Sequence, residues 1–576
     1  MLAAASWRRD AAGIVTTFAC KMIVEKDVPI IVRDGTVLRA NVYRPATDGR
    51  APVIMAQGVY GKDTHFADAF PAQFEALLVT YPDLCRDGST GAYLRWEVVD
   101  PERWVPDGYA VVHVDSRGTG QSPGYLDPRS PVEIRDYYDA IEWAGTQPWS
   151  SGRVGLAGVS YYAFTQWAVA ALQPPHLSAI MPWEGLTDYY RDSTRHGGIF
   201  SNAFTGAWWP RQVLVNQHGN GATRYRDRET GEAPTGQPLS AALLAGNRVD
   251  YMGEYARHPL DDAWYRERSA DLARVVVPLL SAANWGGPGL HLRGNIEGFL
   301  RAGSSRKWLS THVGTHWESF YLPKYVALQK QFFGYFLKDE PNGWGERPPV
   351  LLAVRRVDGG TVDRAEAAFP IERTRYTRYH LDAQNRTLAA NAPNHCASAE
   401  YDAMSEGISF STAPFEREIE WTGFFTAHLT VASSTNDMDI FAVLRLFDPD
   451  DREVVFAGAH ERTPLARGWL RVSHRRLDAQ RSLPYRPFRA HDTLDVMTPG
   501  EAYTVDVEIW PTSIALLPGY RLVLTLLGRD FEYPGVPGRL LHNDPHDRDP
   551  AIFAGRQTVL TGPEHSSYLV VPEIPA

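Results

Sequence analysis

Ser160 is the residue whose setting best suits chemistry, because it stands where a short apolar run meets a helix-like stretch, Gly158-Val-Ser-Tyr-Tyr-Ala163. Gly158 permits a sharp strand-to-helix turn, and Ala163 lets the helix pack close to the strand. Such a nucleophile elbow presents the hydroxyl at the amino end of a helix, where N–H groups and the helix dipole stabilise negative charge. The alternative is an ordinary turn serine, because Tyr162 stands where the motif has its second glycine.

The segments around Ser160 predict a mostly parallel sheet with helices on both faces, which is an α/β fold. A hairpin with Asp34-Gly35 at its bend precedes this sheet. Ligands bind at the carboxyl ends of the strands in such sheets, and Ser160 follows one of these ends. Apart from the elbow strand, the predicted strands are residues 28–32, 37–43, 52–56, 109–115, 177–182, 275–282 and 307–313, and the predicted helices are residues 131–145, 290–302 and 324–337.

Two further regions differ in pattern from this sheet. Residues 188–269 are rich in aromatic residues and glycine with helical stretches, and an insertion of this kind usually forms a cap over the site. After a linker at residues 339–349 the hydrophobic period becomes 2, which predicts an all-β sandwich. Its predicted strands include residues 424–431, 439–447, 503–509 and 520–527.

Composition excludes several classes of protein. The chain has 576 residues, a formal net charge of −10 and three widely spaced cysteines. A nucleic-acid-binding protein would carry a basic face, and a disulfide framework or thiolate metal site would need more cysteines in closer spacing. No apolar run approaches the roughly 20 residues that span a bilayer. We therefore expect a cytoplasmic protein without nucleic-acid or membrane partners; homo-oligomerisation stays open. Residues 1–27 are interpreted as an N-terminal extension rather than a signal peptide.

Neither of two candidate ligand motifs has the spacing its ligand needs. Gly118, Gly120 and Gly124 suggest a dinucleotide-binding turn, but Pro123 occupies the place of its third glycine. The acidic turn at residues 448–451 lacks the spacing and terminal glutamate of a calcium loop. No metal or organic cofactor is expected.

Five motifs in order resemble the CocE/NonD hydrolase family, which includes cocaine esterase, α-amino-acid ester hydrolases and X-Pro dipeptidyl-peptidases. They are residues 53–62 ending in Tyr-Gly-Lys, residues 115–122 (Asp-Ser-Arg-Gly-Thr-Gly-Gln-Ser), residues 158–161 (Gly-Val-Ser-Tyr), the closing strand with His316, and residues 499–511. The resemblance covers about residues 28–570. It implies an α/β-hydrolase domain (28–187 and 270–340), a helical cap (188–269) and a C-terminal jelly-roll domain (349–576).

The resemblance implies the roles of the site residues. Ser160 is the nucleophile, and His316, in the loop after the last sheet strand, is the base that takes its proton. His312 and His291 are the other histidines nearby, and each has an ordinary structural interpretation. The phenol of Tyr60 and the backbone N–H of Tyr161 are the expected oxyanion donors.

The acid of the catalytic triad is missing from its usual place. Relatives carry an aspartate shortly after an aromatic residue at the end of the strand at residues 275–282, and Gly287 occupies that position here. Glu184, at the end of the strand after the elbow, is our candidate for the acid. Asp188 and Glu297 are the alternatives, and a Ser–His dyad is a further possibility.

These residues predict a serine hydrolase that cleaves a small ester or amide through an acyl-enzyme. An X-Pro dipeptidyl-peptidase or an α-amino-acid ester hydrolase or acyltransferase is the alternative within this class, and it would need cap carboxylates such as Asp188 and Asp192 to hold a substrate ammonium. A catalytically silent carbohydrate-binding protein is the alternative from another class. Tryptophans near the site are candidate substrate contacts, or else core residues: Trp183, Trp208, Trp209, Trp285 and Trp317.

Overall fold

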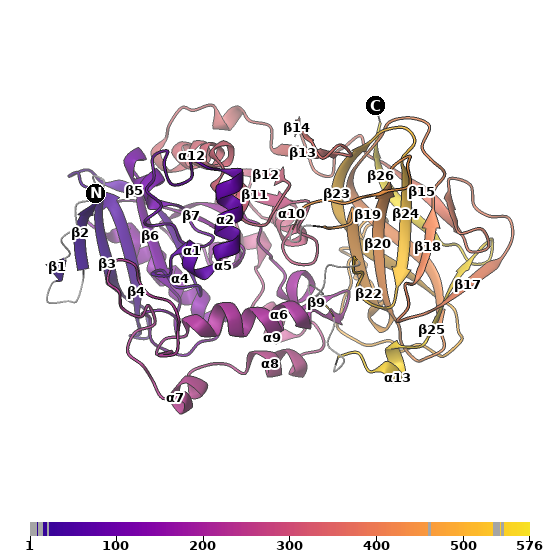
Figure 1. The fold of residues 1–576 in the computed structure, drawn as a ribbon, viewed down its shortest axis with the longest axis horizontal. Helices are drawn as coiled ribbons and strands as arrows, with labels where there is room; N and C mark the ends of the chain where they lie inside the picture. The colour runs from indigo at the N-terminus through magenta and orange to yellow at the C-terminus, as the bar shows by residue number, and fades with distance from the viewer. Residues whose placement is uncertain are drawn as a thin grey trace.

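The computed structural model describes residues 8–9, 15–19, 22–458, 462–533, 542 and 547–575. It contains an α/β domain and a β-rich domain, which lie on the left and right of Figure 1. Much of the predicted N-terminal extension lies outside the described residues. No described helix combines the length and apolar character needed to cross a bilayer.

The first domain has a central sheet whose strands run β3-β4-β6-β5-β7-β8-β11-β12. The strands from β6 to β12 pair in parallel, and β3 and β4 form the predicted antiparallel hairpin. The bounds are β1 Arg8–Arg9, β2 Val15–Ala19, β3 Met22–Ile31, β4 Val37–Pro45, β5 Ala51–Gly58, β6 Ala110–Asp115, β7 Ser150–Val159, β8 Leu177–Trp183, β11 Leu279–Asn284 and β12 Lys307–His312.

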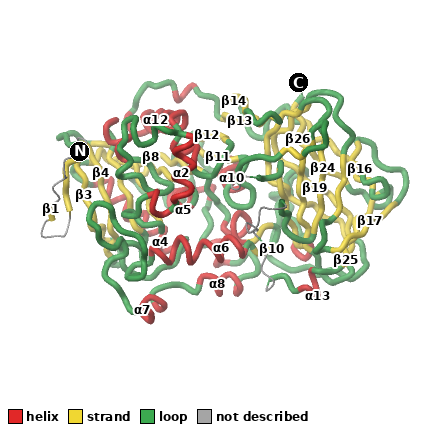
Figure 2. The backbone as a smooth tube through the Cα atoms, in the orientation of Figure 1, coloured by secondary structure: helices red, strands yellow, loops and turns green. Residues whose placement is uncertain are grey.

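Helices pack on both sides of this sheet, as Figure 2 shows in red. Helices α4 and α5 contact each other and β7, whereas α12 lies across the sheet, where Phe333 and Leu337 leave no room for a side chain at Gly155 of β7. Pro131 opens α4, and Ser130 caps it by accepting from the N–H of Glu133. The bounds are α1 Phe66–Ala69, α2 Pro71–Thr80, α3 Pro101–Trp104, α4 Pro131–Thr146, α5 Tyr161–Ala170, α10 Leu292–Arg301, α11 Glu318–Tyr321 and α12 Pro323–Lys338.

The insertion between β8 and β11 folds as short helical pieces, which run along the lower edge of Figure 1. Two π-helical turns, Tyr190–Thr194 and Trp209–Val213, and a two-stranded ribbon interrupt it. The remaining elements are β9 Arg195–His196, β10 Ile199–Phe200, α6 Asn202–Trp208, α7 Ala241–Gly246, α8 Tyr251–Arg257 and α9 Ala263–Arg266.

The C-terminal domain is built almost entirely of antiparallel strands around its own core. Its longest pair is β19 with β23, and a register shift follows Gly423. The bounds are β13 Val350–Arg356, β14 Thr361–Glu366, β15 Arg375–Asp382, β16 Thr387–Ala389, β17 Ala397–Asp402, β18 Ile408–Ser411, β19 Ile419–Ser433, β20 Asp439–Phe447, β21 Glu453–Val454, β22 Ala466–Arg471, β23 Tyr503–Leu516, β24 Arg521–Leu527, α13 Pro550–Phe553, β25 Arg556–Thr561 and β26 Tyr568–Ile574.

One strand joins the two domains. β13 pairs in parallel with β12 of the first domain and, farther along, in parallel with β23 of the second. A hydrophobic cluster lies across the same junction and draws side chains from β11, α10 and the β domain: Trp285, Ile296, Phe369, Phe424, Trp469 and Trp510. The two domains therefore share buried surface as well as a strand ladder.

Most predicted elements agree with the structure to within a few residues, and the differences have physical causes. β3 begins at Met22 and not at residue 28, because residues 22–25 also pair with the end of β4. A register shift between Glu25 and Val28 separates this pairing from that of the predicted strand. The first six residues of this strand therefore lie within the predicted extension. Residues 275–278 do not begin β11; a 3₁₀ turn, Leu272–Arg274, precedes them, and the strand starts at Leu279.

Candidate active site

Ser160 sits in a strained turn between β7 and α5. Its φ is 60°, and its N–H donates to the carbonyls of Trp183 and Glu184, each at 3.0 Å. Gly158 has a φ of 156°, and a Cβ there would lie 2.5 Å from the side chain of Tyr162. A backbone strained in this way persists only where its surroundings hold it, and here they direct the serine side chain outward.

The histidine that contacts Ser160 is His291, immediately before α10. Its Nε2 lies 3.1 Å from Ser160 Oγ. Burial and the neighbouring charge of His316 hold the pKa of His291 well below its usual range, so its imidazole is neutral near pH 7. A neutral imidazole within hydrogen-bond reach of a serine hydroxyl is the arrangement that general-base catalysis requires.

His316 lies beside His291 but is held by two carboxylates. Its Nδ1 is 2.9 Å from Glu184 Oε2, and its Nε2 is 2.8 Å from Glu97 Oε1. Burial opposes the charge, yet these carboxylates raise the pKa of His316 to about 10, so it is an imidazolium at neutral pH. The rings of His316 and His291 stack, with centroids 4.6 Å apart.

The Glu184 carboxylate lies where the side chain of an aspartate at position 287 would reach. A Cβ on Gly287 would lie 3.6 Å from Glu184 Oε2. The other oxygen of Glu184 is 2.8 Å from His312 Nε2 and accepts from Asn284 Nδ2 at 3.1 Å. Although burial disfavours its charge, His316 and His312 lower the pKa of Glu184 to about 2. The sequence-based expectation that Glu184 reaches His316 Nδ1 therefore has the required geometry.

Tyr60 and the start of α5 provide groups suited to an oxyanion. The Tyr60 hydroxyl accepts from Trp208 Nε1 at 3.0 Å, and the ring lies edge-on to that of Tyr161. Burial raises the pKa of Tyr60, opposed in part by hydrogen bonds with Trp208 and Ser160, so the phenol stays protonated. Tyr161 is the first residue of α5, where backbone N–H groups lack intrahelical partners.

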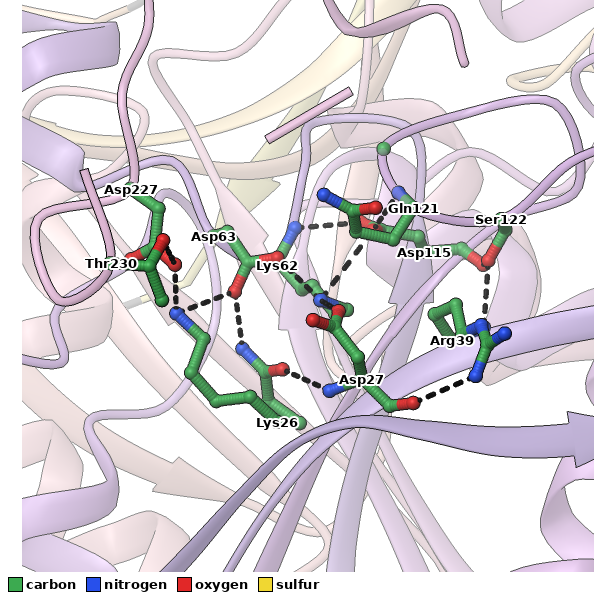
Figure 3. A network of polar contacts seen from close by, with 12 residues as sticks. Lys26, Asp27, Arg39, Lys62, Asp63, Asp115, Gln121, Ser122, Asp227 and Thr230 are labelled. Carbon is green, nitrogen blue, oxygen red and sulfur yellow. Dashed lines mark hydrogen bonds and ion pairs between the residues drawn. The ribbon is translucent and has the colours of Figure 1, made fainter. Parts of the chain in front are cut away.

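A buried network of ions holds the loop that carries Tyr60 (Figure 3). The N–H of Lys62 donates to Asp115 Oδ1 at 2.7 Å, at the end of β6. The Lys62 ammonium pairs with Asp63 and with Asp27, and Lys26 pairs with Asp63 at 3.1 Å and with Asp227 of the insertion. Buried charges of opposite sign hold this loop between the β3–β4 hairpin and the insertion.

The alternative acids lie in other ion pairs. Asp188 pairs with Arg191 at 2.8 Å, and Glu297 lies 3.3 Å from Arg486. Neither has a recorded contact with the site histidines among the described residues.

The candidate tryptophans are mostly packed into the structure. Trp183 is fully buried against His312 and donates to Ser319, and Trp285 donates to the carbonyl of Ala353. Trp209 stacks on Tyr251, whereas Trp317 is only partly buried. The indole N–H of Trp208 donates to the Tyr60 hydroxyl, and the carbonyl of Trp183 accepts from the N–H of Ser160.

Sequence reasoning missed two residues of this cluster. His291 has an ordinary structural interpretation in the sequence, and its only signal is its position shortly after Gly287, where relatives carry an aspartate. Glu97 lies in a long loop with a φ of 64°. Its N–H donates to the Tyr321 hydroxyl and its carbonyl accepts from the N–H of Val159, and these bonds hold the backbone in place. Burial raises the pKa of Glu97 to about 7, opposed by His316. Nothing local in the sequence marks this glutamate.

The cluster is better suited to proton transfer than to metal binding. Glu184, His291 and His316 place three donor atoms within 4.8 Å of one another. A metal ion bound by imidazole lies along the nitrogen lone pair, which is in the ring plane. The two rings are inclined by only 7° and stacked, so their lone pairs lie in parallel planes and do not meet at one point.

Comparisons with known proteins identify the family of the chain. Residues 34–318 match the model of the X-Pro dipeptidyl-peptidase (S15) family, and residues 342–570 that of the X-Pro dipeptidyl-peptidase C-terminal non-catalytic domain. A putative Xaa-Pro dipeptidyl-peptidase of Bacillus anthracis is 34% identical, over 87% of this chain and 82% of that protein. Cocaine esterase of a Rhodococcus species is 24% identical, over 96% and 98%.

A solved structure also matches over nearly its whole length. A CocE/NonD family hydrolase from Staphylococcus aureus is 32% identical with a TM-score of 0.83, covering 99% of this chain and 96% of that one. The fold and the relatives define the class of the protein as a serine hydrolase. The chain belongs to the CocE/NonD hydrolase family, with an S15 catalytic domain followed by an all-β C-terminal domain.

Replacing Glu184 by glutamine should lower kcat by up to about 10⁴-fold, because the imidazolium of His316 loses the charge that balances it. Steady-state kinetics with a 4-nitrophenyl ester would measure this, with Glu297→Gln as the matched buried control. Glu184→Ala combined with Gly287→Asp should recover part of the activity, since both carboxylates reach the same space. Wild-type rates in Glu184→Gln would contradict the assignment.

Replacing Tyr60 by phenylalanine should lower kcat about 10²–10³-fold with little change in KM, because one oxyanion donor is lost and the ring is kept. The same kinetic assay separates the two parameters. If KM alone rises, Tyr60 binds substrate and does not stabilise the transition state.

Proposed function

We propose that this protein hydrolyses a small ester or amide through an acyl-enzyme on Ser160. The observation that carries the proposal is the 3.1 Å contact between Ser160 Oγ and His291 Nε2 at a strained strand-to-helix turn. Ser160 attacks the carbonyl carbon as its proton passes to a histidine. The tetrahedral oxygen is stabilised by Tyr60 and the N–H of Tyr161, the leaving group takes the proton, and water then releases the acid.

Two histidines are candidates for the base, and we favour His291. His316, the base expected from the sequence, has both ring nitrogens hydrogen-bonded to carboxylates and makes no hydrogen bond with Ser160 in the part of the chain that the structure describes. In this scheme His316 is a positioning residue held by Glu184. When His291 gains a proton, its charge lowers the pKa of the stacked His316, which can then pass its Nε2 proton to Glu97 and so relieve the repulsion between two stacked cations.

Ester hydrolysis is favoured over cleavage of peptides with a free amino terminus. The cap carboxylates that could hold a substrate ammonium are paired: Asp188 with Arg191, and Asp192 with Arg293 at 2.8 Å. Binding an ammonium there would require breaking a buried ion pair. The names of the curated relatives support either activity, and the ion pairs support the esterase.

The finer architecture is also part of the proposal. We propose that the insertion acts as a helical cap and that the β domain is a jelly roll, supported by their element types and by the family. We propose the cytoplasm as the compartment, supported by the unpaired Cys85 and Cys396.

Ser160→Ala should abolish both turnover and labelling by a fluorophosphonate, while circular dichroism and the melting temperature stay as in the wild type. The hydroxyl supplies the nucleophile, and its removal leaves the core unchanged. Ser178→Ala, on a partly buried serine of β8, is the control and should keep both activities. Turnover retained in Ser160→Ala would contradict the proposed mechanism.

The pH profile of kcat/KM distinguishes the two histidines. If His291 is the base, its low pKa keeps it neutral well below pH 6.5, so activity stays near its plateau at pH 6. If His316 is the base, its pKa of about 10 makes activity rise about tenfold per pH unit between pH 7 and 9. Glu97→Gln removes the ionisation near pH 7 and separates that contribution from the base.

A further inference from the structure

Arg129 is a buried cation beside the proposed site with no ion-pair partner recorded among the described residues. It lies in the loop between β6 and α4 and is only 6% exposed. One guanidinium nitrogen donates to the Tyr251 hydroxyl at 3.0 Å, and Nε has no hydrogen-bond partner. A buried guanidinium without a counter-ion is costly, so its presence requires a reason.

Aromatic rings surround this guanidinium. Its Cζ lies 4.9–5.6 Å from four ring centroids, which belong to Tyr161, Phe164, Tyr189 and Trp208. Cation–π contacts favour the charge, but neutral rings do not cancel it. A full positive charge therefore remains inside the cage.

The nearby carboxylates have other partners. Glu133 accepts from the Tyr161 hydroxyl at 2.6 Å and from the backbone N–H of Arg129, not from its guanidinium. Asp127 pairs with Arg268 at 2.9 Å. Neither of these carboxylates therefore pairs with the Arg129 guanidinium.

The cage adjoins the reaction centre. Trp208, whose ring faces the guanidinium, donates its N–H to the Tyr60 hydroxyl, and Tyr161 directly follows Ser160. The charge of Arg129 opposes the rise that burial causes in the pKa of Tyr60, and it adds to the effect of burial in lowering the pKa of His291. The ring of Trp208 thus links the Arg129 guanidinium to the hydroxyl of Tyr60, one of the proposed oxyanion donors.

We propose that the substrate carries an anionic group, a carboxylate in the simplest case, that pairs with Arg129. The proposal rests on the proposed function and names its substrate class: an ester or amide with a carboxylate on its acyl part or on its leaving group. An ester with a free ammonium would be repelled by the same charge.

The test compares esters matched in size. On the acyl side, mono-4-nitrophenyl glutarate is compared with 4-nitrophenyl valerate; on the leaving-group side, 4-acetoxybenzoate is compared with its methyl ester. The wild type should prefer the anionic member of one pair by roughly 10- to 100-fold in kcat/KM, the range expected for a charge-assisted hydrogen bond. No preference in either pair would overturn the proposal.

Variants at residue 129 test the assignment itself. In Arg129→Gln the ratio of the two kcat/KM values should fall towards one, and Arg129→Lys should keep part of the preference. A preference unchanged in Arg129→Gln, or an equal loss of activity on both members of a pair, would overturn the assignment.

Should these variants fail to fold, inhibition of the wild type by 3-carboxyphenylboronic acid against phenylboronic acid gives the same comparison. Ser160→Ala, measured in parallel, reports separately on the proposed function: full activity there refutes acyl-enzyme chemistry whatever the preference.

Discussion

The carboxylate of Glu184 is the interaction on which the geometry of the site depends. It lies at the end of β8 and binds His312 at the end of β12, Asn284 at the end of β11 and His316 beyond β12. Its own carbonyl accepts from the N–H of Ser160. One residue thus links the carboxyl ends of four neighbouring strands, and its burial makes each of these bonds stronger than it would be in water.

This linkage explains how the site persists without an aspartate at position 287. In a parallel sheet the ends of adjacent strands lie about 4.8 Å apart, so a longer side chain from one strand can reach the space served by a shorter one from the next. The cost is a second buried carboxylate nearby, Glu97, and a histidine that carries a positive charge at neutral pH and balances both. The neutral His291 is left to contact the serine.

How far the sequence predicts this structure depends on whether a feature is local. The elbow at Ser160, the hairpin and the α/β alternation follow from glycine positions and apolar runs, which act over a few residues. Glu184 was also predicted, because a gap at residue 287 and the adjacency of strands limit the candidates. His291 and Glu97 were missed because stacking and loop placement depend on residues 25 and 219 positions away from His316. The pairing of β13 with strands of both domains also depends on residues far apart in the sequence, and it was missed for the same reason.

The contacts between the insertion and the β domain bear on how substrates enter. The carbonyl of Gly197 accepts from the N–H of Arg471, the Arg191 guanidinium donates to the carbonyl of Arg489, and the N–H of Asp261 donates to the carbonyl of His491. The insertion is therefore braced at both its ends by a domain that is itself joined to the sheet through β13. A hinged lid would have to break these bonds at every turnover. Access to the serine would therefore depend on movements of side chains, and bulky substrates would be selected by their rate of entry rather than by their affinity.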